Sequence, residues 1–236
     1  VRFWYAQAMN LSIADNLKHV QAQIERACQA AGRPVGSVRL LAVSKTWGPE
    51  AVRAAHAAGQ TAFGENYIQE AVEKIALLAD LPLQWHCIGP IQSNKTRLVA
   101  EHFDWVHSVD RLKIAQRLSE QRPPHLPPLQ VCIQVNVDGG VNKAGVSPED
   151  LSPLARAVAS LPHLQLRGLM TIPDPTETPE QMRTVHAQAK ALLDALCAQG
   201  LPLDTLSMGM SADMHAAIAE GSTMVRVGTA IFGSRH

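Results

Sequence analysis

Residues 40–46 read Leu-Leu-Ala-Val-Ser-Lys-Thr, and this stretch indicates the fold. A short apolar run that stops at Lys45 and is soon followed by Gly48 and Pro49 is typical of a buried strand in a parallel sheet. Such a strand would place the amine of Lys45 at its carboxyl end. Because α/β barrels keep their chemistry at that end of the strands, Lys45 is the first candidate functional residue.

Strand-like and helix-like segments alternate along the rest of the chain. Apolar residues at three- and four-residue spacing predict an amphipathic helix over 12–31, before the first strand. The alternation favours a single α/β domain, a (β/α)8 TIM barrel with an additional N-terminal helix, over an open sheet. After the first strand, the expected strands are 61–64, 83–89, 105–109, 129–137, 164–170, 205–208 and 224–227, and the expected helices are 49–58, 67–78, 93–101, 111–120, 148–160, 179–199 and 212–220.

The length of 236 residues suits one barrel and leaves no room for a second domain. We expect the barrel to comprise residues 10–236. Residues 1–9 are expected to be an extension, because Val1 is not an initiator and the helical pattern begins after Met9. The proline-rich stretch 123–128 is expected to be a loop on the N-terminal face of the barrel.

The overall composition argues for a small-molecule site. Lys+Arg and Asp+Glu both number 21, so no net charge favours nucleic acid or an anionic membrane as a partner. No stretch approaches the ~18 apolar residues of a membrane span. The four cysteines lack metal or disulfide spacing, which suits reduced thiols in the cytosol, and the ten histidines form no metal-binding motif. We expect a cytoplasmic, monomeric protein without a metal.

Two of the expected strands end in turns suited to a phosphate group. The stretch Gly-Met-Ser at 209–211 follows the seventh strand, and Gly228 and Thr229 follow the eighth. Small residues and a hydroxyl at the start of a helix leave backbone N–H groups free for an anion, and the loops after strands seven and eight often bind phosphate in barrels. Ser211, Gly228 and Thr229 are therefore candidate phosphate-binding residues.

A lysine and a phosphate site at one barrel mouth indicate a phosphorylated carbonyl compound held as a Schiff base. The residue chemistry leaves two classes open. One is a lysine aldolase acting on sugar phosphates, and the other is a protein that binds pyridoxal 5′-phosphate (PLP).

The sequence also resembles the pyridoxal phosphate homeostasis proteins, in order and from about Leu11 onward. These proteins are similar to the barrel domain of alanine racemase and bind and distribute PLP without a known catalytic reaction. The motifs that carry the resemblance are Leu-Ala-Val-Ser-Lys-Thr at 41–46, Phe-Gly-Glu-Asn-Tyr at 63–67, Trp-His-Cys-Ile-Gly-Pro-Ile-Gln-Ser-Asn-Lys at 85–95, Leu-Arg-Gly-Leu-Met at 166–170, Leu-Ser-Met-Gly-Met-Ser at 206–211 and Val-Arg-Val-Gly-Thr-Ala-Ile-Phe-Gly at 225–233.

The resemblance implies a role for each candidate residue. Lys45 would link PLP, and Ser211, Gly228 and Thr229 would surround its phosphate. Arg226 would lie against the pyridine nitrogen. The remaining edge of the cofactor would be lined by Asn66, His86 and Asn136. PLP-dependent apo-enzymes are the partners that the resemblance implies.

The chain departs from the family pattern in two loops. After Lys45 and Thr46 it carries Trp47 and Gly48 before Pro49, one residue more than the usual Lys-Thr-Lys-Pro. The segment 138–145 keeps the lysine and glycine of the family's fifth loop, with Lys143 and Gly145, but changes the acidic stretch before them. Contacts of ligand or partner at these two loops are therefore open.

The alternative function is a PLP-dependent, racemase-like enzyme acting on amino acids. Two-base racemisation needs a second acid or base facing the lysine across the cofactor. In alanine racemase this is a tyrosine from another domain, whereas this sequence holds only Tyr5 and Tyr67. An arginine at the pyridine nitrogen would also weaken the ring as an electron sink. These two points favour a binding protein over an enzyme.

Overall fold

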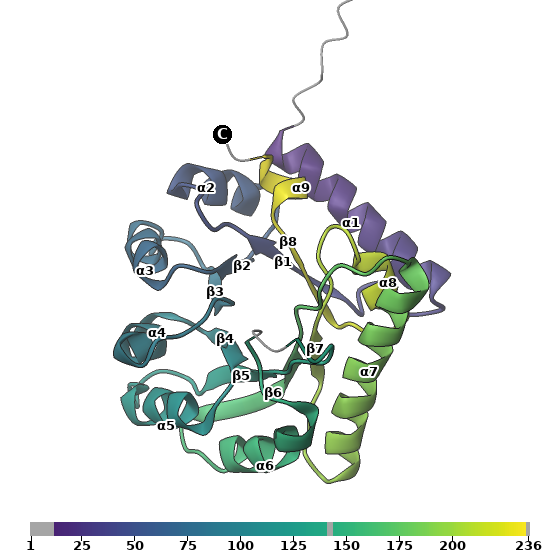
Figure 1. Ribbon diagram of the computed structural model, residues 1–236. Coiled ribbons are helices and arrows are strands. Elements are labelled where there is room, and N and C mark those ends of the chain that lie inside the picture. The colour runs from purple at the N-terminus through teal and green to yellow at the C-terminus, as the bar shows by residue number, and fades with distance from the viewer. Residues whose placement is uncertain (1–11, 141–143, 235–236) are drawn as a thin grey trace, which may run out of the picture.

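The computed structural model describes residues 12–140 and 144–234, and within them eight parallel strands form a closed barrel (Figure 1). Each strand pairs with the next in sequence order, and β1 pairs with β8 to close the sheet. The expected (β/α)8 barrel with an additional N-terminal helix is confirmed. The strands are β1 (Arg39–Val43), β2 (Ala62–Glu65), β3 (Gln84–Cys87), β4 (Trp105–Val109), β5 (Leu129–Gln134), β6 (Leu164–Met170), β7 (Thr205–Ser207) and β8 (Met224–Val227).

Helices surround the barrel, and their ends follow local capping chemistry. Ser12 caps the first helix by accepting from the Asp15 N–H, and Thr178 and Gln181 form a capping box at the start of the longest one. The helices are α1 (Ile13–Ala30), α2 (Pro49–Ala57), α3 (Ile68–Leu77), α4 (Thr96–His102), α5 (Leu112–Gln121), α6 (Pro148–Ala159), α7 (Pro179–Ala198), α8 (Met214–Ala219) and α9 (Thr229–Phe232), with the 3-10 turn η1 (Ser93–Lys95) before α4.

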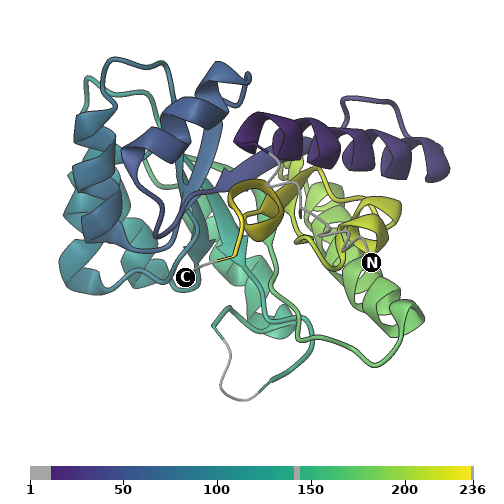
Figure 2. The same cartoon turned by 90° about the horizontal axis from the view of Figure 1, so that it is seen from above.

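The N-terminal helix α1 packs beside α8, α9 and α2, on the outside of the barrel closure (Figures 1 and 2). Asn16 Nδ2 donates to the Ile231 carbonyl at 2.9 Å, and Arg33 donates to the carbonyls of Ile218 at 2.8 Å and Ser222 at 2.7 Å. The additional helix therefore supports the last strand and the short helices on either side of it.

Two strands end two or more residues earlier than the sequence predicted, where side-chain and loop hydrogen bonds follow the last strand residues. The expected strand 83–89 ends at Cys87, and the Ser108 hydroxyl donates to the Gly89 carbonyl. The expected strand 129–137 ends at Gln134, after which Asn136 N–H donates to the Val146 carbonyl at 2.9 Å. Val135 N–H still donates to the Met170 carbonyl of β6 at 3.0 Å, and from Asn136 the chain pairs with the loop that follows it.

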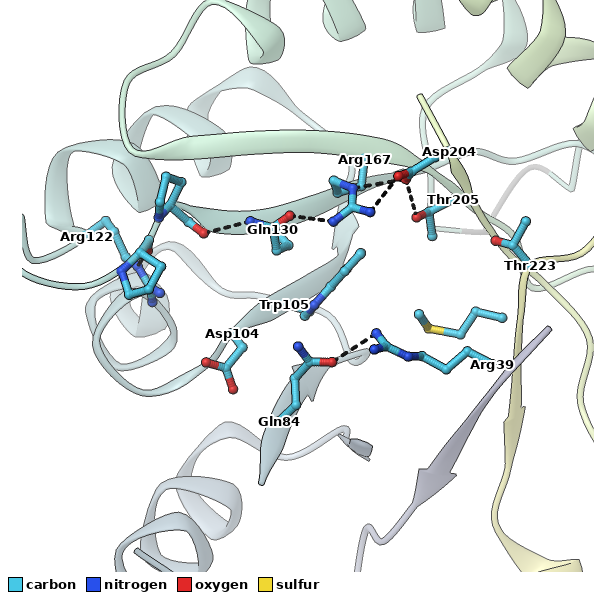
Figure 3. A pocket seen from close by; sticks show the side chains of 13 residues that line it. Arg39, Gln84, Asp104, Trp105, Arg122, Gln130, Arg167, Asp204, Thr205 and Thr223 are labelled. Atoms are coloured by element: carbon cyan, nitrogen blue, oxygen red, sulfur yellow. Dashed lines mark hydrogen bonds and ion pairs between the residues drawn. The ribbon is translucent and has the colours of Figure 1, made fainter. Parts of the chain in front are cut away.

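The N-terminal face of the barrel carries a cavity of about 560 Å3, which we call the lower pocket (Figure 3). It is lined by Arg39, Gln84, Asp104, Trp105, Arg122, Pro127, Pro128, Gln130, Arg167, Asp204, Thr205, Thr223 and Met224. Pro127 and Pro128 lie among residues at the beginnings of the strands, so the expected loop 123–128 is on the predicted face. Within residues 12–140 and 144–234, no helix is both long and apolar enough to cross a membrane.

The pairing of β6 with β7 depends on a glycine. A Cβ atom added to Gly168 would lie 1.7 Å from the carbonyl oxygen of Thr205, the residue paired with it. We therefore expect Gly168→Ala to lower the free energy of unfolding by about 3 kcal/mol, because overpacking against backbone forces the strands apart. Urea unfolding at neutral pH measures this change.

Gly32→Ala is the matched control, because Gly32 has φ +66° but a Cβ there meets nothing within 4 Å. The left-handed conformation alone costs about 1–2 kcal/mol. An equal loss of stability in the two variants would contradict the steric account of Gly168.

Candidate functional site

A second cavity, of about 440 Å3, lies at the carboxyl ends of the strands, and we call it the upper pocket. Its residues come from the first three strands and the loops after them, and from the last part of the chain. Its lining is formed by Val43, Lys45, Trp47, Asn66, Ile88, Ile172, Met210, Ser211, Ala212, Arg226, Gly228, Thr229 and Gly233. Six of the eight predicted site residues, Lys45, Asn66, Ser211, Arg226, Gly228 and Thr229, therefore line one cavity.

Lys45 lies in a sharp turn after β1 and is half-buried. Thr46, the next residue, has φ 67°, a left-handed conformation that is rare for a β-branched residue, and its N–H donates to Glu70 Oε1 at 2.8 Å. The turn is therefore held by α3, and it directs the chain back across the barrel rim immediately after the lysine.

A buried ion pair also holds the residue before Lys45. Lys74 Nζ lies 2.7 Å from Glu65 Oε1 and donates to the Ser44 carbonyl at 2.9 Å, while Ser44 Oγ donates to the same Glu65 oxygen at 2.6 Å. Burial raises the pKa of Glu65, and Lys74 and Ser44 oppose that rise. Sequence reasoning missed Lys74 as a supporting residue, although its spacing from Glu70 on one face of α3 was a usable signal.

Trp47 belongs to the first rim loop, which is one residue longer than the family pattern, and it packs against the short helix after β8. Its ring stacks on Phe232 of α9 with centroids 6.0 Å apart. The insertion relative to the family pattern therefore forms one wall of the upper pocket and links the first rim loop to the last one.

Arg226 is the buried cation of the upper pocket. It sits on β8, donates through NH1 to Ser207 Oγ at 2.8 Å and through NH2 to the Thr171 carbonyl at 2.8 Å. Burial lowers the pKa of Arg226 to about 10, so the side chain still carries its proton at neutral pH. Since a protonated guanidinium only donates hydrogen bonds, any ring atom placed against it must be an acceptor.

The two predicted phosphate turns meet on one side of the pocket. Gly209 has φ +96° after β7, and an added Cβ would lie 2.6 Å from the Ala217 side chain. Gly228 precedes α9, and an added Cβ there would lie 3.1 Å from the Val43 carbonyl. Ser211 and Thr229, which follow these glycines, are exposed and line the same cavity. The glycines let both turns approach β1 and α8 closely.

Known proteins are similar to this chain over nearly its whole length. The model of the family described as alanine racemase, N-terminal domain, matches residues 16–236. A pyridoxal phosphate homeostasis protein from Pseudomonas aeruginosa is 63% identical over 224 residues, which covers 95% of this chain and 96% of that protein. The homologue from Escherichia coli with the same name is 52% identical over 226 residues, 94% of this chain and 97% of its own. The chain belongs to the pyridoxal phosphate homeostasis protein family.

A similar protein of known structure has the same fold. PipY of Synechococcus elongatus, solved with PLP bound, superposes with a TM-score of 0.83 at 42% identity, covering 94% of this chain and all of that one. Alanine racemase from Corynebacterium glutamicum is 19% identical with a TM-score of 0.66, and this likeness concerns the barrel fold alone.

Two predicted site residues of this family member do not line the upper pocket. His86 is fully buried inside the barrel, where its ring nitrogens face His107 and Gln84. Asn136 lies beside a separate surface cavity and bonds within its own loop, to the Gly140 carbonyl and the Gly139 N–H. Lys143, in the variable loop, lies outside the described residues.

The buried histidines should make the protein sensitive to acid. Burial lowers the pKa of His107 to about 3, and burial together with His107 lowers the pKa of His86 well below 6.5. The unfolded chain therefore binds protons below pH 6.5 that the folded barrel does not, so stability falls as pH falls. Well below pH 6.5, we expect the free energy of unfolding to drop by up to about 1.4 kcal/mol per pH unit for each ring.

Urea unfolding at several values between pH 7.5 and 5 measures this slope. His107→Gln removes one of the two titrating rings and keeps a donor near the position of Nε2, so at the acidic end of this range the slope should decrease by up to about 1.4 kcal/mol per pH unit. Carboxylates contribute equally to both proteins. Identical slopes in the variant and the wild type would contradict the assignment of buried, neutral histidines.

Proposed function

We propose that this chain binds PLP in the upper pocket, with the cofactor attached to Lys45 as a Schiff base, and acts in PLP homeostasis. One observation carries the proposal: Lys45, Arg226 and the two small-residue turns after β7 and β8 line the same cavity. The names of the relatives and the PLP bound to PipY support it.

The residues present fit the cofactor. Asn66 Oδ1 is buried and, among the described residues, has no hydrogen-bond partner, so it is an acceptor that a ligand hydroxyl could satisfy. A Cβ on Gly89 would lie 2.2 Å from the Asn66 carbonyl, so this close approach holds Asn66 at the pocket wall. Amine, cation, hydroxyl and amide groups thus surround one cavity whose remaining walls, Val43, Ile88 and Ile172, are apolar.

Each residue would then have a distinct task. Lys45 Nζ would supply the amine that holds the aldehyde carbon of PLP as a Schiff base, with the loss of one water molecule. Arg226 donates a hydrogen bond to the ring nitrogen. Ser211, Gly228 and Thr229 bind the phosphate through hydroxyl and backbone N–H groups. The bound cofactor supplies an electrophilic ring, and the pocket determines whether that ring is used.

We propose that this pocket binds and carries PLP rather than using it in catalysis. Arg226 keeps its own proton at neutral pH, so a ring nitrogen beside it accepts a hydrogen bond and is not protonated. An unprotonated ring is a poor electron sink for carbanion chemistry on amino acids. A cytoplasmic monomer that stores PLP and supplies it to PLP-dependent apo-enzymes is the role that agrees with this chemistry.

Lys45→Ala tests the covalent attachment. Wild-type protein loaded with PLP should show a visible absorption band that borohydride abolishes by reducing the Schiff base to a stable secondary amine. Lys45→Ala should lack both the band and the borohydride-fixed adduct, while PLP held by the phosphate turns alone can remain. Absorption spectra and intact mass after reduction provide the measurement.

Lys95→Ala is the control, because Lys95 lies in η1, at the third rim loop, and does not line the upper pocket. A full borohydride-fixed adduct in Lys45→Ala would overturn the assignment of the linking lysine. Racemisation of L-alanine by the wild type that is lost in Lys45→Ala would favour the racemase-like alternative.

The phosphate site makes a separate prediction. Ligand bound only to the native state should raise the free energy of unfolding by about 2.7 kcal/mol at 100 times its dissociation constant. Pyridoxal without the phosphate, at the same concentration as PLP, should stabilise the protein far less. Thermal unfolding with each compound measures the difference, and equal protection by both would refute the roles of Ser211, Gly228 and Thr229.

A further inference from the structure

A line of polar side chains runs through the interior of the barrel from the upper pocket to the lower pocket. Branched apolar residues usually fill this space in such barrels, so polar groups there need a reason. Successive contacts of 2.8, 2.8, 2.9, 3.1 and 3.1 Å join Arg226, Ser207, His107, His86, Gln84 and Arg39. Figure 3 shows the lower end of this line, where Arg39 contacts Gln84.

The lower end of the line determines which way its hydrogen bonds point. The Arg39 guanidinium can only donate, and its NH1 contacts Gln84 Oε1 at 3.1 Å. The amide oxygen of Gln84, not its nitrogen, must therefore face Arg39. The same oxygen lies 3.1 Å from His86 Nε2, so His86 must carry its hydrogen on Nε2.

The donor-to-acceptor direction is the same at both histidines, because each ring is neutral and has one donor and one acceptor nitrogen. Burial lowers the pKa values of both rings, so each has one N–H and one bare nitrogen at neutral pH. With its hydrogen on Nε2, His86 accepts through Nδ1 from His107 Nε2 at 2.9 Å. His107 then accepts through Nδ1 from the Ser207 hydroxyl at 2.8 Å. The Ser207 oxygen remains to accept from Arg226.

The rings are also held against rotation. His86 stacks on Trp105 with centroids 5.2 Å apart and planes at 9°, and Arg167 covers the Trp105 ring at 5.0 Å from its centroid. Arg167 is in turn held by both carboxylate oxygens of Asp204, at 3.0 and 2.6 Å. The lower pocket thus constrains His86 through two contacts, a hydrogen bond that His86 donates to Gln84 and a stacked ring.

We propose that His86 and His107 are positioning residues that hold Arg226 in place. They connect Ser207 to Gln84 in a chain of hydrogen bonds in which every donor lies on the side of the upper pocket and every acceptor on the side of the lower pocket. The opposite tautomer of His107 would direct two donors at Ser207 and leave the serine hydroxyl hydrogen to find another acceptor in the barrel interior. The chain therefore favours one orientation of the Arg226 guanidinium. This inference rests on the proposed function only where Arg226 meets the ring nitrogen of PLP.

The tautomers can be measured without any cofactor. Long-range 1H–15N correlation spectra of 15N-histidine-labelled, PLP-free protein distinguish Nε2–H from Nδ1–H rings, and His86→Gln and His107→Gln assign the two signals. Both rings should be neutral Nε2–H tautomers at pH 7. A neutral Nδ1–H form of either ring, or a protonated ring, would overturn the proposal even if the protein binds PLP.

Variants at the lower end test whether Gln84 sets the tautomers. Gln84→Glu keeps an acceptor and should keep both rings as Nε2–H, whereas Gln84→Met removes it and should introduce a second tautomer. Gln130→Met is the matched control, because Gln130 lies in the same pocket but accepts from Arg167 at 2.8 Å instead of facing a histidine. Unchanged tautomers in Gln84→Met would refute the role of Gln84.

The effect on Arg226 is tested with a PLP analogue in which carbon replaces the ring nitrogen. Ser207→Ala removes the acceptor of Arg226 NH1 and should weaken PLP binding about tenfold, the loss expected for one charge-assisted hydrogen bond, with little effect on the analogue. Equal losses for both ligands, or no loss for PLP, would show that the chain does not act through Arg226. A wild-type protein that binds neither ligand would refute the proposed function and leave the tautomer result standing.

Discussion

Hydrogen-bonded pairing of β1 with β8 is the constraint on which the rest of this structure depends. The register places Arg39 opposite Met224 and Ala42 opposite Val227, so the two ends of the sequence become neighbours along one seam. That seam brings Lys45 to the same cavity as Arg226, Gly228 and Thr229. Because β1 ends in a turn held by Glu70 and by the Lys74–Glu65 pair, the backbone on both sides of Lys45 in sequence, at Ser44 and Thr46, is fixed by hydrogen bonds.

The side chains inside the barrel differ in polarity from those between the strands and the helices. The helices pack on the strands through an apolar core, whereas part of the interior is filled by hydrogen-bonded polar groups. Buried polar groups are expensive unless each donor finds an acceptor, and a fully satisfied network is rigid. In the chain from Arg226 to Gln84, every contact has one donor and one acceptor. This interior therefore stabilises one arrangement of side chains between the two pockets rather than filling space.

Local patterns predicted much of the fold and most of the candidate site. The strands 164–170 and 224–227 have the predicted bounds, because apolar composition and flanking turns define them locally. Ser211, Gly228 and Thr229 were predicted from their places after strands and before helices. His86 was assigned to the cofactor by a motif, yet its side chain points into the barrel interior. A motif identifies a position along the chain, but the direction of a side chain depends on the twist and register of the strand that carries it.

The sequence by itself determined the barrel, the position of Lys45 at a strand end and membership of a PLP-binding family. The first two features follow from local periodicity and from residue order, and the third follows from the motifs that resemble those of the family. Only the tertiary structure decided which polar residues meet inside the barrel, since His86, His107 and Ser207 lie on three strands and are 21 and 100 residues apart along the chain. It also decided the direction of their hydrogen bonds, because that direction depends on a contact between Arg39 on β1 and Gln84 on β3. Contacts of this kind leave no periodic signal in a sequence, since they arise from strand stagger and barrel closure.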